Sequence, residues 1–296
     1  MSSMEFWQSI ARTDPDQLAP VARLAEELGF SGLTMADHLA RPLSIRSRYP
    51  YATDGWMATD ESTPYLDPWI LSASLARVTR KLRFMSSVYI PALRDPFSVA
   101  KAISTAALLS GDRVLIGIGV GWMEEEFELA GRPFRQRGRR TEELMQVVRK
   151  LFSGEMVEHH GEFYDFDPVQ MAPVPSQHPL VLIGGHSPKA LRRAAAADGW
   201  LGVNYDLETV PPILEALRAN RRELGREHEP FEAALALNAP PELDDLYRLE
   251  AAGLTMIVNP PGLRATGERT SLDEKCRQLE SYAKRFIEPL HHGRKG

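Results

Sequence analysis

The chain has 296 residues, of which 43% are hydrophobic and 25% are charged, and its formal net charge is -5. This balance is typical of a globular protein, and the absence of a long basic run argues against nucleic acid as a partner. Cys276 is the only cysteine, which excludes an internal disulfide and a multi-cysteine metal site. We expect a cytoplasmic protein with no signal peptide and no membrane span.

Predicted strands and helices alternate along the chain, the strands as short apolar runs and the helices as apolar residues at helical spacing. The predicted strands cover residues 6–11, 32–36, 82–90, 114–121, 180–183, 200–204, 231–238 and 255–259. The predicted helices cover residues 18–28, 69–78, 95–109, 141–152, 187–197, 209–224 and 272–286, with a further helix beginning at Glu124. Eight strands with helical crossovers predict an α/β fold, the parallel (β/α)8 TIM barrel, as a single domain over residues 1–296.

Two segments do not fit the alternation. Residues 41–67 are rich in Pro, Tyr, Ser and charge without a helical period, and we expect a long loop at the same end of the barrel as His38. Residues 154–179 contain two short aromatic runs and several prolines, which predicts an inserted hairpin followed by an irregular connection.

In a parallel barrel the reactive groups lie at the C-terminal ends of the strands and in the loops that follow them. That rule selects the candidate site residues, which we expect to converge on one mouth. They are Asp37, His38, Ser87, Val88, Gly119, Val120, Gly121, Trp122, Gly184, Gly185, His186, Ser187 and Asn204.

The segment from Gly184 to Pro188 joins a predicted strand to a predicted helix. Its glycines allow close approach, and free amides with the Ser187 hydroxyl at a helix N-terminus favour a phosphate. A tight turn with Ser187 as an ordinary N-cap explains the same residues equally well. Lys189 and Arg192 nearby favour an anion.

The glycines before Trp122 lack the G-x-G-x-x-G spacing of a dinucleotide loop, so we reject a Rossmann interpretation. They either clear space for a flat ring or allow close backbone packing. His38 at a strand end is either a structural, hydrogen-bonded histidine or a proton-transfer group, and Asp37 and the long following loop favour the second interpretation.

The remaining histidine and arginine groups are expected to be solvated. His159 with His160, and His291 with His292, lack a third ligand at a suitable spacing, so no metal site is predicted. The basic cluster at residues 135–140 predicts a solvated face, with contact to an anionic tail as the alternative.

Four stretches of the chain resemble the bacterial luciferase-like monooxygenase superfamily, and in particular its branch of oxidoreductases that depend on the deazaflavin coenzyme F420. The stretches are LAEELGFSGLTMADHL, LRFMSSVYIPALRDPFSVAKA, LLSGDRVLIGIGVGWMEEEFELAG and VLIGGHSPKALRRAAAADGW, in the family's order and spacing. The resemblance implies a barrel with an insertion, a homodimer and a cofactor held in the barrel mouth.

The resemblance also implies roles for individual residues. Asp37 and His38 would lie beside the cofactor ring, with His38 as a proton donor or acceptor. The Ser87-Val88 bond matches a non-proline cis peptide that backs the ring, and Gly184, Gly185 and Ser187 match the loop that receives the cofactor phosphate. Trp122 replaces the acidic catalytic residue of some sugar-phosphate dehydrogenases, and Ala36 replaces a more usual serine.

The leading hypothesis is hydride transfer between F420 and a small organic substrate, with His38 handling the proton. An aromatic lid is expected from Tyr49, Tyr51, Trp56 and Trp122, and Arg41, Arg46 and Arg48 are expected to meet the acidic cofactor tail. The enzymatic alternative is an FMN-dependent monooxygenase, which needs the same phosphate loop. A cofactor-binding barrel without turnover is the third hypothesis, and no hypothesis specifies the substrate.

Overall fold

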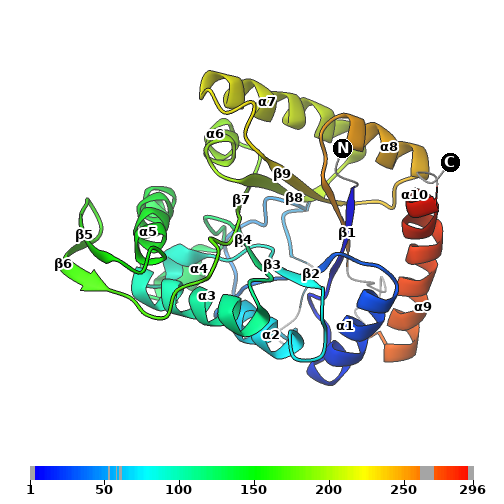
Figure 1. The fold of residues 1–296 in the computed structure, drawn as a ribbon, viewed down its shortest axis with the longest axis horizontal. Helices are drawn as coiled ribbons and strands as arrows, with labels where there is room; N and C mark the ends of the chain where they lie inside the picture. The colour runs from blue at the N-terminus through cyan, green and yellow to red at the C-terminus, as the bar shows by residue number, and fades with distance from the viewer. Residues whose placement is uncertain (1–3, 53, 58, 60–61, 261–269, 293–296) are drawn as a thin grey trace.

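The computed structural model describes residues 4–52, 54–57, 59, 62–260 and 270–292. Within these residues, eight parallel strands close into a barrel in the order β1-β10-β9-β8-β7-β4-β3-β2, and helices surround it (Figure 1). The barrel strands are β1 (Glu5–Ser9), β2 (Gly32–Met35), β3 (Arg83–Ser86), β4 (Val114–Ile118), β7 (Val181–Gly184), β8 (Gly199–Tyr205), β9 (Glu232–Leu237) and β10 (Met256–Asn259). The fold is the expected (β/α)8 TIM barrel.

The helices of the described residues form the outer layer and flank the strand ends. They are α1 (Leu18–Glu27), α2 (Pro68–Leu75), α3 (Pro96–Ser110), α4 (Glu124–Leu129), α5 (Arg137–Leu151), α6 (Pro188–Ala196), α7 (Val210–Glu223), α8 (Leu243–Ala251), α9 (Leu272–Tyr282) and α10 (Glu288–His292). A π-helical turn over Ala283–Ile287 joins α9 to α10. In the described part of the chain, no helix has both the length and the apolar character needed to cross a membrane.

A large indole fills the interior of the barrel. Trp7 on β1 is fully buried and packs with inward-facing side chains of the other strands. Gly32 on β2 makes this possible, because a Cβ atom there would lie 2.3 Å from the Trp7 ring. Arg83 lies over the same ring, 5.1 Å from its centroid, and forms an ion pair with Glu5. The barrel is therefore a packed core and not a passage.

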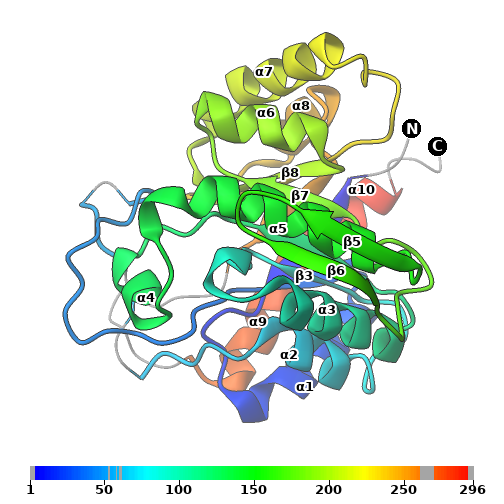
Figure 2. The same ribbon diagram turned by 90° about the vertical axis from the view of Figure 1, so that its left-hand side faces the viewer.

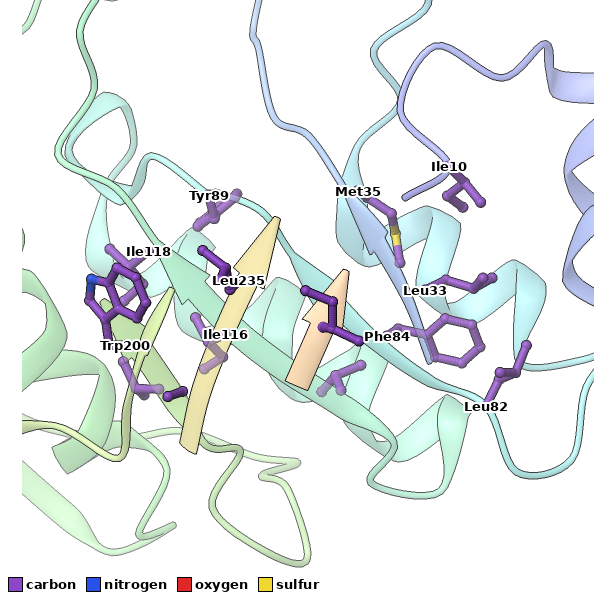
Figure 3. Packing of buried hydrophobic residues seen from close by; sticks show 14 of the residues in the cluster. Ile10, Leu33, Met35, Leu82, Phe84, Tyr89, Ile116, Ile118, Trp200 and Leu235 are labelled. Carbon is purple, nitrogen blue, oxygen red and sulfur yellow. The ribbon is translucent and has the colours of Figure 1, made fainter. Parts of the chain in front are cut away.

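The outward faces of the strands pack against the helices and form the larger part of the core. Leu33, Phe84, Ile116 and Leu235 come from four different strands and are fully buried in one cluster (Figure 3). Apolar residues face both sides of every barrel strand except β2, whose inward positions are Gly32 and Thr34, and this is the pattern expected of a parallel sheet covered by helices.

The predicted insertion is confirmed as an antiparallel hairpin of β5 (Met156–His160) and β6 (Asp165–Gln170), which packs on α5 (Figure 2). Glu143 on α5 anchors it by accepting hydrogen bonds from the backbone N–H groups of Phe163 and Tyr164 at 3.0 and 2.8 Å. The expectation that His159 is solvated is wrong, because its side chain is buried and lies 3.3 Å from a Glu143 oxygen.

Two further differences from the sequence predictions concern element boundaries. The strand predicted for residues 82–90 ends at Ser86, and pairing with β4 returns at an isolated bridge between Tyr89 and Ile118. Helix α8 was not among the predicted helices, since only Leu246 and Leu249 of its residues are buried and its apolar pattern is correspondingly short.

Candidate active site

His38 is held by a carboxylate from a different element. Its Nδ1 atom lies 2.9 Å from Oε2 of Glu126 on α4, and the other oxygen of Glu126 accepts a hydrogen bond from the Leu39 N–H at 2.8 Å. Glu126 is 4% exposed. Because an ionised carboxylate only accepts hydrogen bonds, Nδ1 carries the hydrogen in this arrangement. The nitrogen left to accept a proton is therefore Nε2.

Asp37, next to His38, is buried and paired. Its two oxygens accept hydrogen bonds from Arg94 at 2.8 Å each, and one oxygen also accepts from the Ile90 N–H at 3.1 Å. Burial raises the pKa of Asp37, and the hydrogen bonds from Arg94 oppose that effect. Burial also acts to lower the pKa of Arg94, but the Asp37 carboxylate outweighs it. The pair ties the segment after β2 to the segment after β3.

The Ser87-Val88 peptide bond is cis, as the resemblance implied. The Val88 side chain lies among glycines of the neighbouring strands: a Cβ atom on Gly119 would lie 2.4 Å from Val88 Cγ2, and one on Gly184 would lie 3.3 Å from Val88 Cγ1. These short distances show that the ends of β3, β4 and β7 lie close together. Val88 forms part of the mouth between them.

The turn after β7 also lies at this mouth. Gly185 has a φ of 108°, a conformation that favours glycine, and its carbonyl oxygen accepts a hydrogen bond from Trp200 Nε1 at 2.9 Å. Ser187 caps α6 through its hydroxyl, which accepts from the Ala190 N–H at 3.2 Å. Among the described residues, no group accepts a hydrogen bond from the backbone N–H of His186 or Ser187. Ser187 is therefore an N-cap, and the two N–H groups beside it have no acceptor among the described residues.

A row of aromatic rings connects His38 to this turn. The ring centroids are separated by 6.5 Å from His38 to Trp122, 5.2 Å from Trp122 to Tyr49, 5.6 Å from Tyr49 to Tyr51 and 6.2 Å from Tyr51 to His186. Both tyrosines come from the loop between β2 and α2, which lies beside α4 (Figure 2). The structure therefore brings the predicted strand-end residues together at one end of the barrel.

The two tyrosines hold the loop against the mouth. Asn204, which has a φ of 60°, donates a hydrogen bond to the Tyr49 hydroxyl at 3.3 Å, and the Tyr51 ring also lies 6.3 Å from the Tyr205 ring. Burial raises the pKa of Tyr49 to about 12, so this phenol is neutral at physiological pH. Trp56 is 57% exposed and lines a small cavity together with Trp122.

Residues 4–246 match the family model described as luciferase-like monooxygenase. The chain belongs to this family. An uncharacterized protein of Mycobacterium tuberculosis is 37% identical over 288 residues, which cover 96% of this chain and 99% of that protein. An F420-dependent glucose-6-phosphate dehydrogenase of Gordonia bronchialis is 23% identical, over 95% of this chain and 82% of that one.

The fold of this luciferase-like chain is also similar to that of a monooxygenase whose crystal structure has been solved. The monooxygenase RslO1 from Streptomyces bottropensis superimposes with a TM-score of 0.77 at 18% identity, covering 96% of this chain and 99% of that chain. At 18% identity this comparison shows a similar fold, and we infer no shared activity from it.

Sequence reasoning missed the partners of the predicted residues in this luciferase-like chain. The sequence places Glu126 only within the helix that begins at Glu124, and it gives Arg94 no role. Arg137, within the basic cluster expected to be solvated, donates a hydrogen bond from Nε to the Gly121 carbonyl oxygen at 2.9 Å. The one available signal was position, since Glu126 and Arg94 lie soon after β4 and β3.

Of the arginines expected to meet a cofactor tail, Arg46 is bound elsewhere. It pairs with Glu128 at 2.7 Å and lies 3.6 Å from Glu125, both on α4. Arg41 donates to the Thr59 hydroxyl at 2.5 Å. His291 and His292, for which no metal role was expected, have side chains outside the described residues.

Proposed function

We propose that this luciferase-like protein is an oxidoreductase that binds coenzyme F420 and transfers a hydride between it and a small organic substrate. The observation that carries the proposal is the row of rings joining His38 to the turn at Gly184–Ser187 at one end of the barrel. A cofactor with a planar ring and a phosphate-bearing side chain needs one group beside its ring and another at its phosphate. His38 at one end of the row would serve the ring, and the turn at the other end would serve the phosphate.

The residues present fit such a cofactor. The turn lacks a Cβ at Gly185, where one would lie 3.1 Å from Ala190, and it offers the backbone N–H groups of His186 and Ser187 to a phosphate. Val88 would support one face of the ring. Arg137, on the neighbouring helix, adds positive charge near the same end.

The protein's part in the reaction is orientation and proton handling. When bound, F420 supplies a ring carbon that accepts or gives the hydride. His38 would take up or release the accompanying proton at Nε2, while Glu126 holds the hydrogen on Nδ1. Asp37 would act as a positioning residue through Arg94, because its oxygens are already occupied.

Binding would displace the tyrosines of the loop from the mouth. Tyr49 and Tyr51 lie between His38 and the phosphate turn, and a hydrogen bond of 3.3 Å from Asn204 is the polar contact that holds Tyr49 there. After the loop has moved, the same aromatic residues would close over the bound ligands and exclude water. Arg41 and Arg48 on this loop would then meet the acidic tail of F420.

An FMN-dependent monooxygenase is the second candidate. The family model that the chain matches is described as luciferase-like monooxygenase, and the turn at Gly184–Ser187 suits the phosphate of FMN equally well. The two candidates differ in the ring and in the acidic tail, not in the phosphate loop.

Titration of the purified chain with F420 and with FMN, followed by quenching of Trp fluorescence, tests the proposal. We expect saturable F420 binding that is at least tenfold weaker in Gly185→Val, whose added side chain enters the turn. His38→Ala should retain binding and lose turnover, whereas His160→Ala, an exposed histidine on the hairpin, should change neither. Tight FMN binding without F420 binding would contradict the proposal and favour the monooxygenase. Binding without turnover of any substrate would favour a storage barrel.

The proposal includes a homodimer through α2 and α3. These helices lie side by side and carry exposed apolar residues, with Ile70 74%, Leu108 38% and Leu109 59% exposed. Helices that are apolar on their outer face usually have a partner. A solution mass of two chains, measured by light scattering, is the expected result.

A further inference from the structure

The small cavity that Trp56 and Trp122 line lies within the long loop between β2 and α2. Its volume is about 130 Å³, and every lining residue except Trp122 belongs to residues 41–57 of this loop. Pockets that hold a whole small molecule usually measure about 300–1,000 Å³. This cavity therefore suits one end of a ligand and is too small for the whole of one.

Two walls of the cavity lie close to His38. Trp122 lines the cavity, and its ring centroid is 6.5 Å from that of His38. Met57 also lines it, and the Met57 sulfur lies 3.9 Å from the hydroxyl oxygen of Tyr65, whose ring centroid is 4.6 Å from that of His38. The cavity is therefore a neighbour of the proposed active site.

Contacts of the loop with α4 and with itself hold the cavity in place. Ser47 lines the cavity, and its N–H donates to Glu125 Oε1 at 3.1 Å while its hydroxyl accepts from the Glu124 N–H at 3.0 Å. Gly55 lies on another wall, and its carbonyl oxygen accepts a hydrogen bond from the Tyr49 N–H at 2.8 Å. The walls are thus formed before any ligand enters.

Arg41 brings a positive charge without a counter-charge to this cavity. It lines the space, and its Nη1 atom donates to the Thr59 hydroxyl at 2.5 Å. The Nε atom is buried and has no hydrogen-bond partner, and among the described residues no carboxylate pairs with Arg41 and no acidic side chain lines the cavity. A buried donor without a partner is destabilising, so an acceptor supplied by a ligand would remove a penalty.

The free edge of Arg41 indicates the chemistry of that acceptor. With Nη1 occupied, Nε and Nη2 still present one edge of the guanidinium, and two parallel hydrogen bonds from such an edge match the two oxygens of a carboxylate. Arg48 adds a second positive charge, because its Nη1 atom would lie 3.2 Å from a Cβ atom on Gly55. The other walls are mainly apolar and suit a carbon chain, with Leu43, Ile45, Trp56 and Met57 among them.

We propose that this cavity is a carboxylate site, in which the free edge of Arg41 holds the carboxylate and the adjoining carbon chain packs against Trp56 and Trp122. Two sources present this group, the acidic tail of F420 and an acidic substrate. The choice between the two sources rests on the proposed function, whereas the carboxylate site itself does not.

NMR titration of the full chain, without cofactor, with propionate and with propionamide tests the proposal. The two probes have nearly the same shape, but propionamide is neutral. The indole N–H signals of Trp56 and Trp122, assigned from Trp56→Phe and Trp122→Phe, report on the cavity. We expect saturable shifts with propionate and binding at least tenfold weaker with propionamide, because the amide forms no charge-assisted pair with Arg41.

Arginine variants test which cation holds the carboxylate. Arg41→Gln should weaken propionate binding at least tenfold, the loss expected for one charge-assisted pair, and Arg48→Gln should weaken it less. Arg46→Gln is the matched control, because Arg46 belongs to the same loop but pairs with Glu128 and does not line the cavity, and it should bind propionate like the parent chain. The proposal is overturned if propionate shifts neither indole signal, if propionamide binds equally well, or if Arg41→Gln binds propionate like the parent chain.

A second titration, with F420 and with a truncated form that lacks the acidic tail, identifies the source of the carboxylate. If the tail supplies it, F420 displaces propionate, the truncated form does not, and Arg41→Gln weakens the binding of F420 alone. If the substrate supplies it, propionate binds the F420-loaded chain as it binds the free chain, and Arg41→Gln binds both forms like the parent. A chain that binds propionate but not F420 would contradict the proposed function and leave the carboxylate site in place.

Discussion

Replacing Glu126 tests whether a buried carboxylate sets the tautomer of His38. The structure gives Glu126 two hydrogen bonds, at 2.9 Å to His38 and 2.8 Å to the Leu39 N–H, and 4% exposure. Glu126→Ala leaves both donors without a partner, at about 1–3 kcal/mol each, so we expect a loss of about 3 kcal/mol in the free energy of unfolding. Urea denaturation measures that loss.

Glu126→Gln makes a sharper test, because its amide can accept only through one oxygen and donates through nitrogen. If the oxygen keeps the Leu39 N–H, the amide NH₂ faces His38 Nδ1, and the imidazole hydrogen moves to Nε2. Long-range ¹H–¹⁵N NMR of the ring distinguishes the two tautomers. Glu128→Gln, which removes an exposed carboxylate of the same helix, should cost less than 1 kcal/mol and leave the tautomer unchanged. A parent chain with hydrogen already on Nε2, or an unchanged tautomer in Glu126→Gln, would refute the reasoning.

Four further predictions follow from contacts described above. Asp37→Asn leaves the Arg94 guanidinium without its carboxylate and should lower the free energy of unfolding by about 3–5 kcal/mol. The double variant Asp37→Leu with Arg94→Met removes both charges and should lose clearly less. Equal losses in urea denaturation would contradict this. Burial alone would raise the pKa of Glu143, but backbone hydrogen bonds lower it below the ordinary value of 4.5. The stabilisation is therefore present above pH 4.5 and lost as the pH falls below it, so Glu143→Gln should show a flatter stability profile between about pH 3 and 5. Tyr51→Ala should speed F420 association several-fold in stopped-flow fluorescence, and an unchanged rate would mean that the loop does not limit entry. Ile70→Glu should halve the solution mass, and a mass that stays at two chains would exclude the α2 and α3 face.

The barrel could be predicted from the sequence because each strand is a short apolar run followed by a polar or glycine-rich segment. The end of β3 could not be predicted, because the apolar run continues to Ile90 while the pairing with β2 stops at Ser86. The hairpin was predicted from its aromatic runs, but the burial of His159 depends on Glu143 of a different element. Neither the hydrophobic periodicity nor the composition of a segment tells which side chain of another element it will contact.

The positions of the site residues were predictable from the rule on strand ends, and their partners were not. His38 and Gly184–Ser187 lie where that rule places them, at one end of the barrel. Glu126 and Arg94 are selected by how α4 and the segment after β3 pack, which is a property of the tertiary structure. The same holds for the loop, because Tyr49 and Tyr51 were expected as a lid but not as occupants of the mouth.

The indole of Trp7 in the barrel centre has a kinetic consequence. Trp7 and the ion pair between Arg83 and Glu5 fill the barrel interior. Ligands can therefore reach the mouth only from its solvent side. Two ligands that share it cannot enter from opposite directions, so the one seated deeper arrives first and departs last. On the proposed function, with the substrate stacked above the cofactor, steady-state turnover should follow a compulsory order in which the cofactor binds first.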